Sequence, residues 1–482
     1  MEIKNLKPTE VFQYFDEILQ IPRPSKKEEK IIAYLENFAK KNNLDFKKDK
    51  VGNVLIKKPA TPGYEDKPIV ILQSHLDMVP EKRTDLQHNF ETDPIQAFVD
   101  TDNWIKTNGT TLGADDGIGI AAAMAVLTHK ELKHPAIEAL FTVDEETGMT
   151  GAFGIEKGFL NGEILINLDS EDEGELFIGS AGGMDTTAVF KYDRRPSKDK
   201  DLAIEISIDK LHGGHSGDEI DKGYANAIQL LNRFLWNVYN SIDLDLYHFE
   251  GGKLRNAIPK DAKAIIAISE DKYPKFETLF TEYKKVFANE YGVIEPNMVF
   301  EFKKVEKPEM IIDRATAHSF LWSVYSCPHG VYAMDPEIEN LVQTSTNLAT
   351  VKTLEDQIVI GSSQRSSIDS SKIDIATKVR TSFELAGAEV KHGSFYPGWK
   401  PNPQSAILKT TVESYEKLFK TKPIVRAIHA GLECGLFLEK YPNFDMISFG
   451  PTIKGAHTPE EKLEISTVEK FWLLLVDVLE NI

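Results

Sequence analysis

Short apolar runs alternate with helical patterns along the first third of the chain. Buried-type strands are predicted at residues 68–72, 139–143 and 164–168, because short continuous apolar runs bounded by turn residues favour strands. Between the first two strands lies an alanine-rich stretch, residues 117–130, whose composition favours a helix. This alternation predicts an α/β domain with a mixed, largely parallel central sheet and flanking helices.

The pattern changes near residue 185. A charged turn is followed at residues 202–208 by alternating apolar and polar positions, which predicts a strand in a sheet with one face in water. A helix predicted at 224–239 and an apolar run at 263–268 continue an α+β pattern.

A second boundary is predicted where three prolines and a glycine interrupt the chain at residues 396–403. After it we expect a strand at 444–449 and a terminal helix opened by a capping box, Ser466-Thr467-Val468-Glu469. We therefore expect a catalytic domain made of residues 1–185 and 397–482, into which a second domain, residues 186–396, is inserted.

Composition narrows the class of protein. The chain has 482 residues and a formal net charge of -19, which disfavours nucleic acid and anionic membranes as partners. The N-terminus lacks the apolar core of a signal peptide, and we find no apolar run long enough to span a bilayer. Cys327 and Cys434 are far apart, so they predict buried, inert thiols and a reducing, cytoplasmic location.

Acidic and histidine side chains follow several of the predicted strands. Ligands bind outside the carboxyl ends of strands in open α/β sheets, and imidazoles with carboxylates suit divalent ions such as zinc, manganese or cobalt. These groups exceed what one tetrahedral ion needs, so we expect two ions. The segments are His75-Leu76-Asp77, Asp144-Glu145-Glu146, Asp169 and His457, with Asp115 at a predicted helix start.

Each segment also has a purely structural interpretation. A single His-x-Asp is usually a surface accident, and Glu145-Glu146 alone would be a solvated pair. The acidic stretch after Asp169 could be an exposed turn, and His457 a loop histidine. Their common position at strand ends in one predicted sheet favours a site.

Together these segments resemble the dinuclear-zinc peptidase family that includes aminoacylases, carnosinases and carboxypeptidase G. Within it the chain is most similar to the bacterial aminoacyl-histidine (Xaa-His) dipeptidases, and the likeness spans essentially the whole chain. The motifs concerned are Ser74-His75-Leu76-Asp77-Met78-Val79, Gly109-Thr110-Thr111-Leu112-Gly113-Ala114-Asp115-Asp116-Gly117, Asp144-Glu145-Glu146-Thr147-Gly148, Asn167-Leu168-Asp169-Ser170-Glu171, Gly213-Gly214-His215-Ser216-Gly217 and Gly455-Ala456-His457-Thr458-Pro459-Glu460.

The resemblance implies a role for each matched residue of the predicted metal site. One ion would be held by His75 and Asp169 and the other by Glu146 and His457. Asp115 would bridge the two ions. The remaining matches are Asp77, implied to hydrogen-bond the His75 ring, and Glu145, implied to be the catalytic base.

The resemblance also implies functions for the inserted domain, which in this family acts as a lid and often as a dimer contact. His215 matches the histidine that stabilises the oxyanion, often in the partner subunit's site, although on its own it favours a tight turn. Asn256 and Gly431 match substrate-contacting positions. Arg365 matches the arginine that binds the substrate carboxylate, a task suited to a guanidinium, but it could equally form a surface ion pair.

Two features need separate interpretation. Asp116 departs from the asparagine that we associate with this subfamily, and its carboxylate could tune metal affinity or be solvated. The stretch Gly117-Ile118-Gly119-Ile120-Ala121-Ala122 fits a dinucleotide-binding pattern. We reject that interpretation, because no apolar strand precedes it and Asp115-Asp116 would repel a pyrophosphate.

The sequence thus predicts a cytoplasmic, homodimeric metallo-dipeptidase that uses two divalent ions, zinc above all, and prefers Xaa-His substrates such as carnosine. The alternatives left open are an N-acyl-amino-acid deacylase or carboxypeptidase of the same fold, and a catalytically inactive binding or assembly protein. A two-metal phosphoesterase is disfavoured, since no Arg or Lys cluster accompanies the ligand segments.

Overall fold

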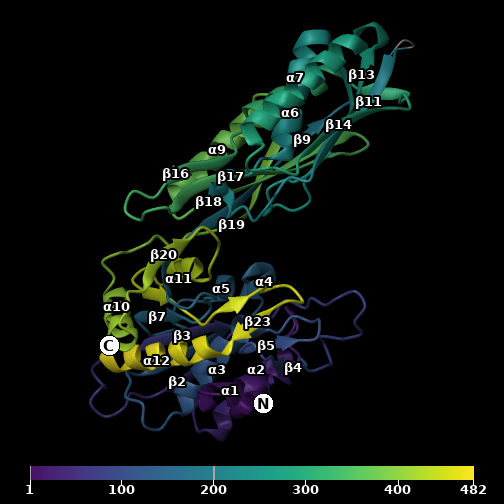
Figure 1. The fold of residues 1–482 in the computed structure, drawn as a ribbon. Helices are drawn as coiled ribbons and strands as arrows, with labels where there is room; N and C mark the ends of the chain where they lie inside the picture. Colours follow the sequence, from purple (N-terminus) through teal and green to yellow (C-terminus); the bar gives the residue numbers. More distant parts are fainter. Residues whose placement is uncertain (1, 199–200) are drawn as a thin grey trace. The chain divides into compact units, whose positions relative to one another are not determined.

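The structure is a computed structural model that describes residues 2–198 and 201–482. The chain divides into two compact units. The first unit comprises Met1–Ser180, Trp399–Ala427 and Leu432–Ile482, and the second comprises Ala181–Gly398 and Ile428–Gly431. The purple and yellow ends of the ribbon in Figure 1 therefore belong to the same unit.

A mixed sheet with a parallel centre forms the core of the first unit. Its strands, in spatial order, are β1 (Asp45–Lys48), β2 (Val54–Lys58), β6 (Ile137–Thr142), β3 (Val70–His75), β7 (Ile164–Asn167), β21 (Asp445–Ser448), β8 (Glu175–Ser180) and β20 (Ile424–Ile428). The neighbours β6, β3, β7 and β21 run parallel, whereas β1, β2 and β8 pair antiparallel beside them. The predicted α/β fold class is confirmed. The four strands predicted for this domain are β3, β6, β7 and β21, which form the parallel centre of the sheet.

Helices flank this sheet. They are α1 (Thr9–Leu19), α2 (Glu29–Lys41), α3 (Ala114–Thr128), α4 (Glu145–Gly148), α5 (Thr150–Gly154), α10 (Ala406–Phe419), α11 (Cys434–Lys440) and α12 (Ile465–Asn481). Helix α3 contacts both α1 and β3 and is buried around nearly its whole circumference, as expected for a helix that is apolar on all sides. A smaller sheet, in the order β22 (Ile453–Lys454), β23 (Lys462–Glu464), β5 (Trp104–Thr107) and β4 (Ala97–Val99), completes the unit.

The start of the terminal helix differs from its prediction. Helix α12 begins at Ile465, and Glu464 stands at the N-cap without a side-chain capping bond. The expected capping box is wrong, because Ser466 lies inside the helix and its hydroxyl hydrogen-bonds to Glu464 Oε1 at 2.9 Å.

An antiparallel sheet with helices along it forms the second unit (Figure 1). Its strands, in spatial order, are β14 (Val299–Val305), β11 (Asp201–Asp209), β13 (Ala262–Ser269), β12 (Asp245–Gly251), β17 (Val342–Thr353), β18 (Gln357–Ser366), β9 (Gly182–Lys191) and β19 (Glu389–Tyr396), with β16 (Gly330–Met334) beside β17. The helices are α6 (Ala227–Ile242), α7 (Tyr273–Tyr291), α8 (Arg314–Ser326) and α9 (Asp369–Glu384), and a separate pair joins β10 (Arg194–Pro196) to β15 (Met310–Ile312). Inward positions of β11 are buried and alternate with more exposed ones, as predicted for a sheet with one face in water.

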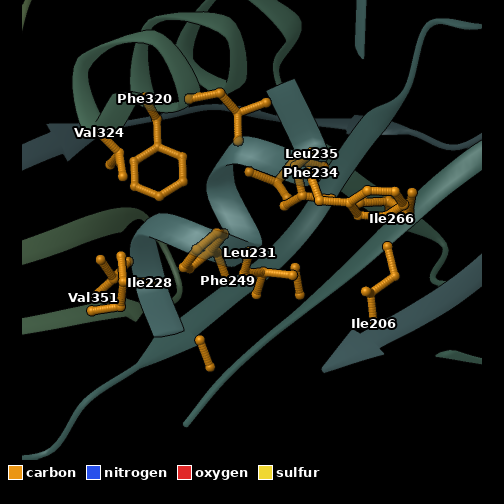
Figure 2. Close-up of a cluster of buried hydrophobic side chains, with 14 of the residues drawn as sticks. Ile206, Ile228, Leu231, Phe234, Leu235, Phe249, Ile266, Phe320, Val324 and Val351 are labelled. Carbon is orange, nitrogen blue, oxygen red and sulfur yellow. The ribbon is translucent and has the colours of Figure 1, made fainter. Parts of the chain in front are cut away.

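Helix α6 lies at the centre of the apolar core of the second unit. Figure 2 shows its residues Phe234 and Leu231 packed among side chains of neighbouring strands and of α8, including Phe249 and Phe320. The helix starts at Ala227 rather than at the predicted residue 224, because the Asn226 side chain accepts hydrogen bonds from the first-turn N–H groups and so fixes the N-cap.

The structure also bears on the predictions about the cysteines and about membrane-spanning helices. Cys327 and Cys434 are free and buried, as predicted. Within residues 2–198 and 201–482, none of the helices combines the length and the apolarity that crossing a membrane would need.

Candidate functional site

Three neighbouring parallel strands of the first unit end at the predicted site. Strand β3 ends at His75, β6 is followed by Glu145 and Glu146 at the start of α4, and β7 is followed by Asp169. Their carboxyl ends lie at one edge of the sheet, which is where ligands bind in such sheets. Asp115 joins them from the start of α3, where its backbone is non-helical (φ -77°, ψ 111°).

The five residues predicted as metal ligands lie together, and Asp115 is their centre. His75 Nε2 lies 3.0 Å from Asp115 Oδ1 and 3.4 Å from Asp169 Oδ1. On the other side, His457 Nε2 lies 3.1 Å from Asp115 Oδ2 and 2.9 Å from Glu146 Oε2. The two oxygens of one carboxylate therefore face two separate groups of donors, each with one imidazole and one further carboxylate.

The chemistry of these groups fits a cation at each position. Burial raises the pKa of Asp169 to about 7 and that of Glu171 to about 8, and the neighbouring Asp115 carboxylate adds to both shifts. Acids buried this close together are costly without a compensating positive charge. One donor atom each from His75, Asp115 and Glu146 lie within 4.8 Å of one another, so donors from both groups lie close to the Asp115 carboxylate.

Asp77 lies behind the His75 ring. Its Oδ1 is 3.4 Å from His75 Nδ1, and its two oxygens accept hydrogen bonds from the backbone N–H groups of Glu145 at 3.0 Å and Glu146 at 3.3 Å. Burial opposes ionisation of Asp77, but the His75 ring, the Ser25 side chain and the Glu145 N–H group lower its pKa to about 2. One buried carboxylate thus orients an imidazole and the turn that holds both glutamates.

Glu145 is half-buried beside this turn. Burial raises the pKa of its carboxyl well above the usual range, and the charges of Asp169 and Glu433 raise it further against the opposing effect of His75. A pKa perturbed in this way is typical of carboxyls at functional sites.

Asp116 is buried, so the interpretation as a solvated carboxylate is wrong. Its Oδ1 accepts a hydrogen bond from Gly119 N at 3.1 Å, and its Oδ2 accepts one from His75 N at 3.3 Å. The side chain therefore caps the regular part of α3 and fixes the backbone of a predicted ligand.

The remaining predicted residues belong to the second unit. His215 Nδ1 lies 3.0 Å from Asp218 Oδ2, and the His215 ring lowers the pKa of that carboxyl. Asn256 is exposed in a loop beside it, where its carbonyl accepts a hydrogen bond from Ser216 N at 2.8 Å.

Arg365 and Gly431 occupy two other elements of this unit. Arg365 lies on β18, is 7% exposed and has Nη1 3.3 Å from the Tyr396 hydroxyl. It forms none of the ion pairs found within the described residues, so the surface ion-pair interpretation is wrong. Gly431 is a half-buried loop position at the end of the segment Ile428–Gly431.

Sequence reasoning missed the buried titratable residues on either side of Gly431. In the second unit, His429 is buried with Nε2 2.7 Å from Ser345 Oγ, and burial with the nearby Arg365 charge lowers its pKa to about 3. In the first unit, Glu433 accepts hydrogen bonds from Gln73 and Thr142 at 2.7 Å and 2.6 Å. Both residues flank Gly431, so their position next to a matched segment was the available signal.

The comparisons with known proteins agree with this geometry. The model of peptidase family M20/M25/M40 matches residues 71–481. The cytosol non-specific dipeptidase of Escherichia coli (strain K12) is 40% identical over 481 residues, covering 100% of this chain and 99% of that protein.

Solved structures give the same result. The crystal structure of aminoacylhistidine dipeptidase from Vibrio alginolyticus has a TM-score of 0.93 and 44% identity, covering 100% of this chain and 98% of that one. The aminopeptidase PepT of Bacillus cereus, with a TM-score of 0.59 and 17% identity over 99% of each chain, shares the fold. The resemblance found in the motifs is confirmed: this chain belongs to peptidase family M20/M25/M40.

Proposed function

We propose that this protein is a metal-dependent dipeptidase with sites for two divalent ions, both of which would have Asp115 as a ligand. The observation that supports this most strongly is the position of the Asp115 carboxylate, with His75 3.0 Å from one oxygen and His457 3.1 Å from the other. The E. coli and Vibrio relatives are both dipeptidases, which supports the same reaction class.

The proposed ligands divide into two sets. His75 and Asp169 would hold one ion, Glu146 and His457 would hold the other, and Asp115 would be a ligand of both. Two imidazoles with three carboxylates suit zinc best, with manganese or cobalt also compatible. Bound there, a pair of divalent ions would polarise the scissile carbonyl and lower the pKa of a water molecule.

The protein's own groups then account for the proton transfers. A Glu145 carboxylate oxygen accepts the proton of the attacking water and returns it to the nitrogen of the leaving amine. Asp77 keeps the His75 ring in place and, through the two backbone N–H groups, keeps Glu145 beside the ligands.

Groups of the second unit are proposed to bind the substrate. His215 would stabilise the oxyanion, and Arg365 would bind the substrate's terminal carboxylate through its guanidinium, with Asn256 and Gly431 contacting the peptide. A homodimer formed through the second unit would allow His215 to act in the partner's site. A cytoplasmic location is proposed because the E. coli relative is a cytosol dipeptidase.

The substrate class is tested with a panel assayed on metal-reconstituted protein: Ala-His, carnosine, other dipeptides, a tripeptide and an N-acyl amino acid. We expect hydrolysis of dipeptides, fastest for Xaa-His, and loss of activity after dialysis against EDTA. Preferential cleavage of the N-acyl amino acid or of the tripeptide would replace the dipeptidase assignment with a deacylase or carboxypeptidase. Retention of full activity after complete metal removal would contradict the metal-dependent mechanism.

A further inference from the structure

A buried glutamate, Glu461, binds the turn that contains Asp115. Its side chain is 3% exposed, and its two oxygens accept hydrogen bonds from four successive backbone N–H groups. These come from Leu112 at 2.7 Å, Gly113 at 3.0 Å, Ala114 at 2.8 Å and Asp115 at 3.3 Å. Without this carboxylate the four donors would be buried and unpaired, which is costly.

Glu461 also belongs to the segment that contains His457. It lies four residues beyond His457, and its backbone N–H donates to the Thr458 carbonyl at 3.1 Å. The segment is otherwise open to solvent, since the His457 side chain is 53% exposed. Glu461 therefore connects the His457 segment to the Asp115 turn through buried hydrogen bonds. The two proposed ligands lie close together as well, with His457 Nε2 3.1 Å from Asp115 Oδ2.

A second buried charge, Arg23, attaches the turn to the end of β3. The Arg23 side chain is 2% exposed, and its Nη1 donates to the carbonyls of Leu76 at 2.9 Å and Asp77 at 2.6 Å. Its Nη2 donates to the Gly113 carbonyl. A Cβ at Gly117 would lie only 2.6 Å from Nη2, so the guanidinium packs directly against the start of α3. The Asp115 turn is thus fixed on one side by Arg23 and on the other by Glu461.

We propose that Glu461 is a positioning residue for catalysis: by binding the backbone of residues 112–115 it sets the spacing between Asp115 and His457 that a second metal ion requires. This inference depends on the proposed function, in which Asp115 and His457 are ligands. The hydrogen bonds to the Glu461 carboxylate come from the backbone of residues 112–115, so it acts through the backbone of the turn.

The substitution Glu461→Gln keeps the size of the side chain but removes its charge and one of its two acceptor oxygens. The glutamine side chain would offer one acceptor oxygen, and its amide group would face two of the N–H donors. The matched control is Glu460→Gln, which makes the same change at the neighbouring exposed position.

The experiment measures metal binding and catalysis in the full-length protein. Apo protein is titrated with Co²⁺ while the absorption of the bound ion is followed, and kcat and KM are measured with Ala-His at saturating Co²⁺. For Glu461→Gln we expect the second equivalent of Co²⁺ to bind at least about tenfold more weakly. We also expect kcat to fall about 10²-fold with little change in KM, as for a displaced catalytic group. Glu460→Gln should match the parent protein.

The outcome that overturns the proposal is a Glu461→Gln protein that binds both equivalents with parental affinity and turns over at the parental kcat. If that variant does not fold, Glu461→Asp, which keeps the charge but retracts the carboxylate, provides the same comparison. Asp115→Ala separates this inference from the proposed function. If Asp115→Ala still binds two equivalents tightly, the bridging assignment itself fails. If Asp115→Ala loses the second equivalent but Glu461→Gln behaves like the parent, the bridging assignment stands and only the positioning role of Glu461 fails.

Discussion

The Asp77 carboxylate accepts the backbone N–H of Glu145 at 3.0 Å while the same oxygen lies 3.4 Å from the His75 ring. One buried side chain thus connects a proposed metal ligand with the proposed base. The connection passes through two backbone N–H groups, since Glu146 also donates to Asp77 at 3.3 Å. The ionised Asp77 carboxylate is therefore one of the groups that position the α4 turn.

Replacing Asp77 by asparagine tests this connection. The amide group of Asn would face an N–H donor where the carboxylate had accepted one, so the α4 turn and the His75 ring should both shift. We expect kcat/KM for Ala-His to fall about 10- to 100-fold, the usual effect of removing a partner of a metal-ligating histidine. Asp85→Asn, an exposed acid in the same unit, is the control, and an Asp77→Asn protein as active as this control would contradict the assignment.

Glu145→Ala tests the proposed base. The five proposed ligands are untouched in this variant, so metal content should equal that of the parent. Turnover of Ala-His should fall by at least about 10²-fold, because positioned proton transfer contributes that much. Metal analysis beside steady-state kinetics checks both points, and hydrolysis at the parental rate would show that another group takes the proton.

Phe234→Ala tests the core of the second unit. Phe234 is fully buried and packs edge-to-face on Phe276 and Phe300, with ring centroids 5.9 Å and 5.3 Å away. Truncation should lower the free energy of unfolding of this unit by about 3–5 kcal/mol. Tyr332→Ala, at a side chain that is 50% exposed, should cost less than about 1 kcal/mol. Urea unfolding followed by circular dichroism measures both, and equal midpoints for the two variants would contradict the packing described.

The buried His429 predicts a pH dependence of stability. Its pKa is lowered to about 3 in the folded protein, whereas an unfolded histidine titrates near about 6.5. The unfolded state therefore takes up the proton first. The stabilisation from neutral His429 is complete above about pH 6.5 and is lost as the pH falls from there toward about 3.

A His429→Gln variant lacks this titration. Between about pH 7.5 and pH 5, the parent should lose about 2 kcal/mol more stability than the variant. Urea unfolding of both apo proteins at several pH values measures the difference and excludes metal loss as its cause. Parallel pH profiles for the two proteins would show that His429 is not buried in its neutral form.

Some of the fold was predictable from local sequence. The apolar runs that became β3, β6, β7 and β21 are buried on both faces, and such strands leave continuous apolar stretches in sequence. Boundaries were less predictable where one side chain decides them. Asn226 moves the start of α6, and Glu464, not Ser466, precedes α12.

The candidate site was likewise predictable only in part. Its acids and histidines follow strand ends, and this pattern is visible in the sequence. Arg23 and Glu461 were missed because they bind backbone carbonyls and N–H groups, which any residue supplies, so no complementary side-chain pattern marks them. The burial of Asp116 was missed for the same reason, since its carboxylate accepts hydrogen bonds from the backbone N–H groups of His75 and Gly119.

The central claim, a pair of ions sharing Asp115, is tested most directly by counting metal. Elemental analysis of the purified, zinc-reconstituted protein should give close to two ions per chain. The Asp115→Ala protein should retain fewer than one after the same desalting. A parent protein that holds a single tightly bound ion, or an Asp115→Ala protein that still holds two, would contradict the account.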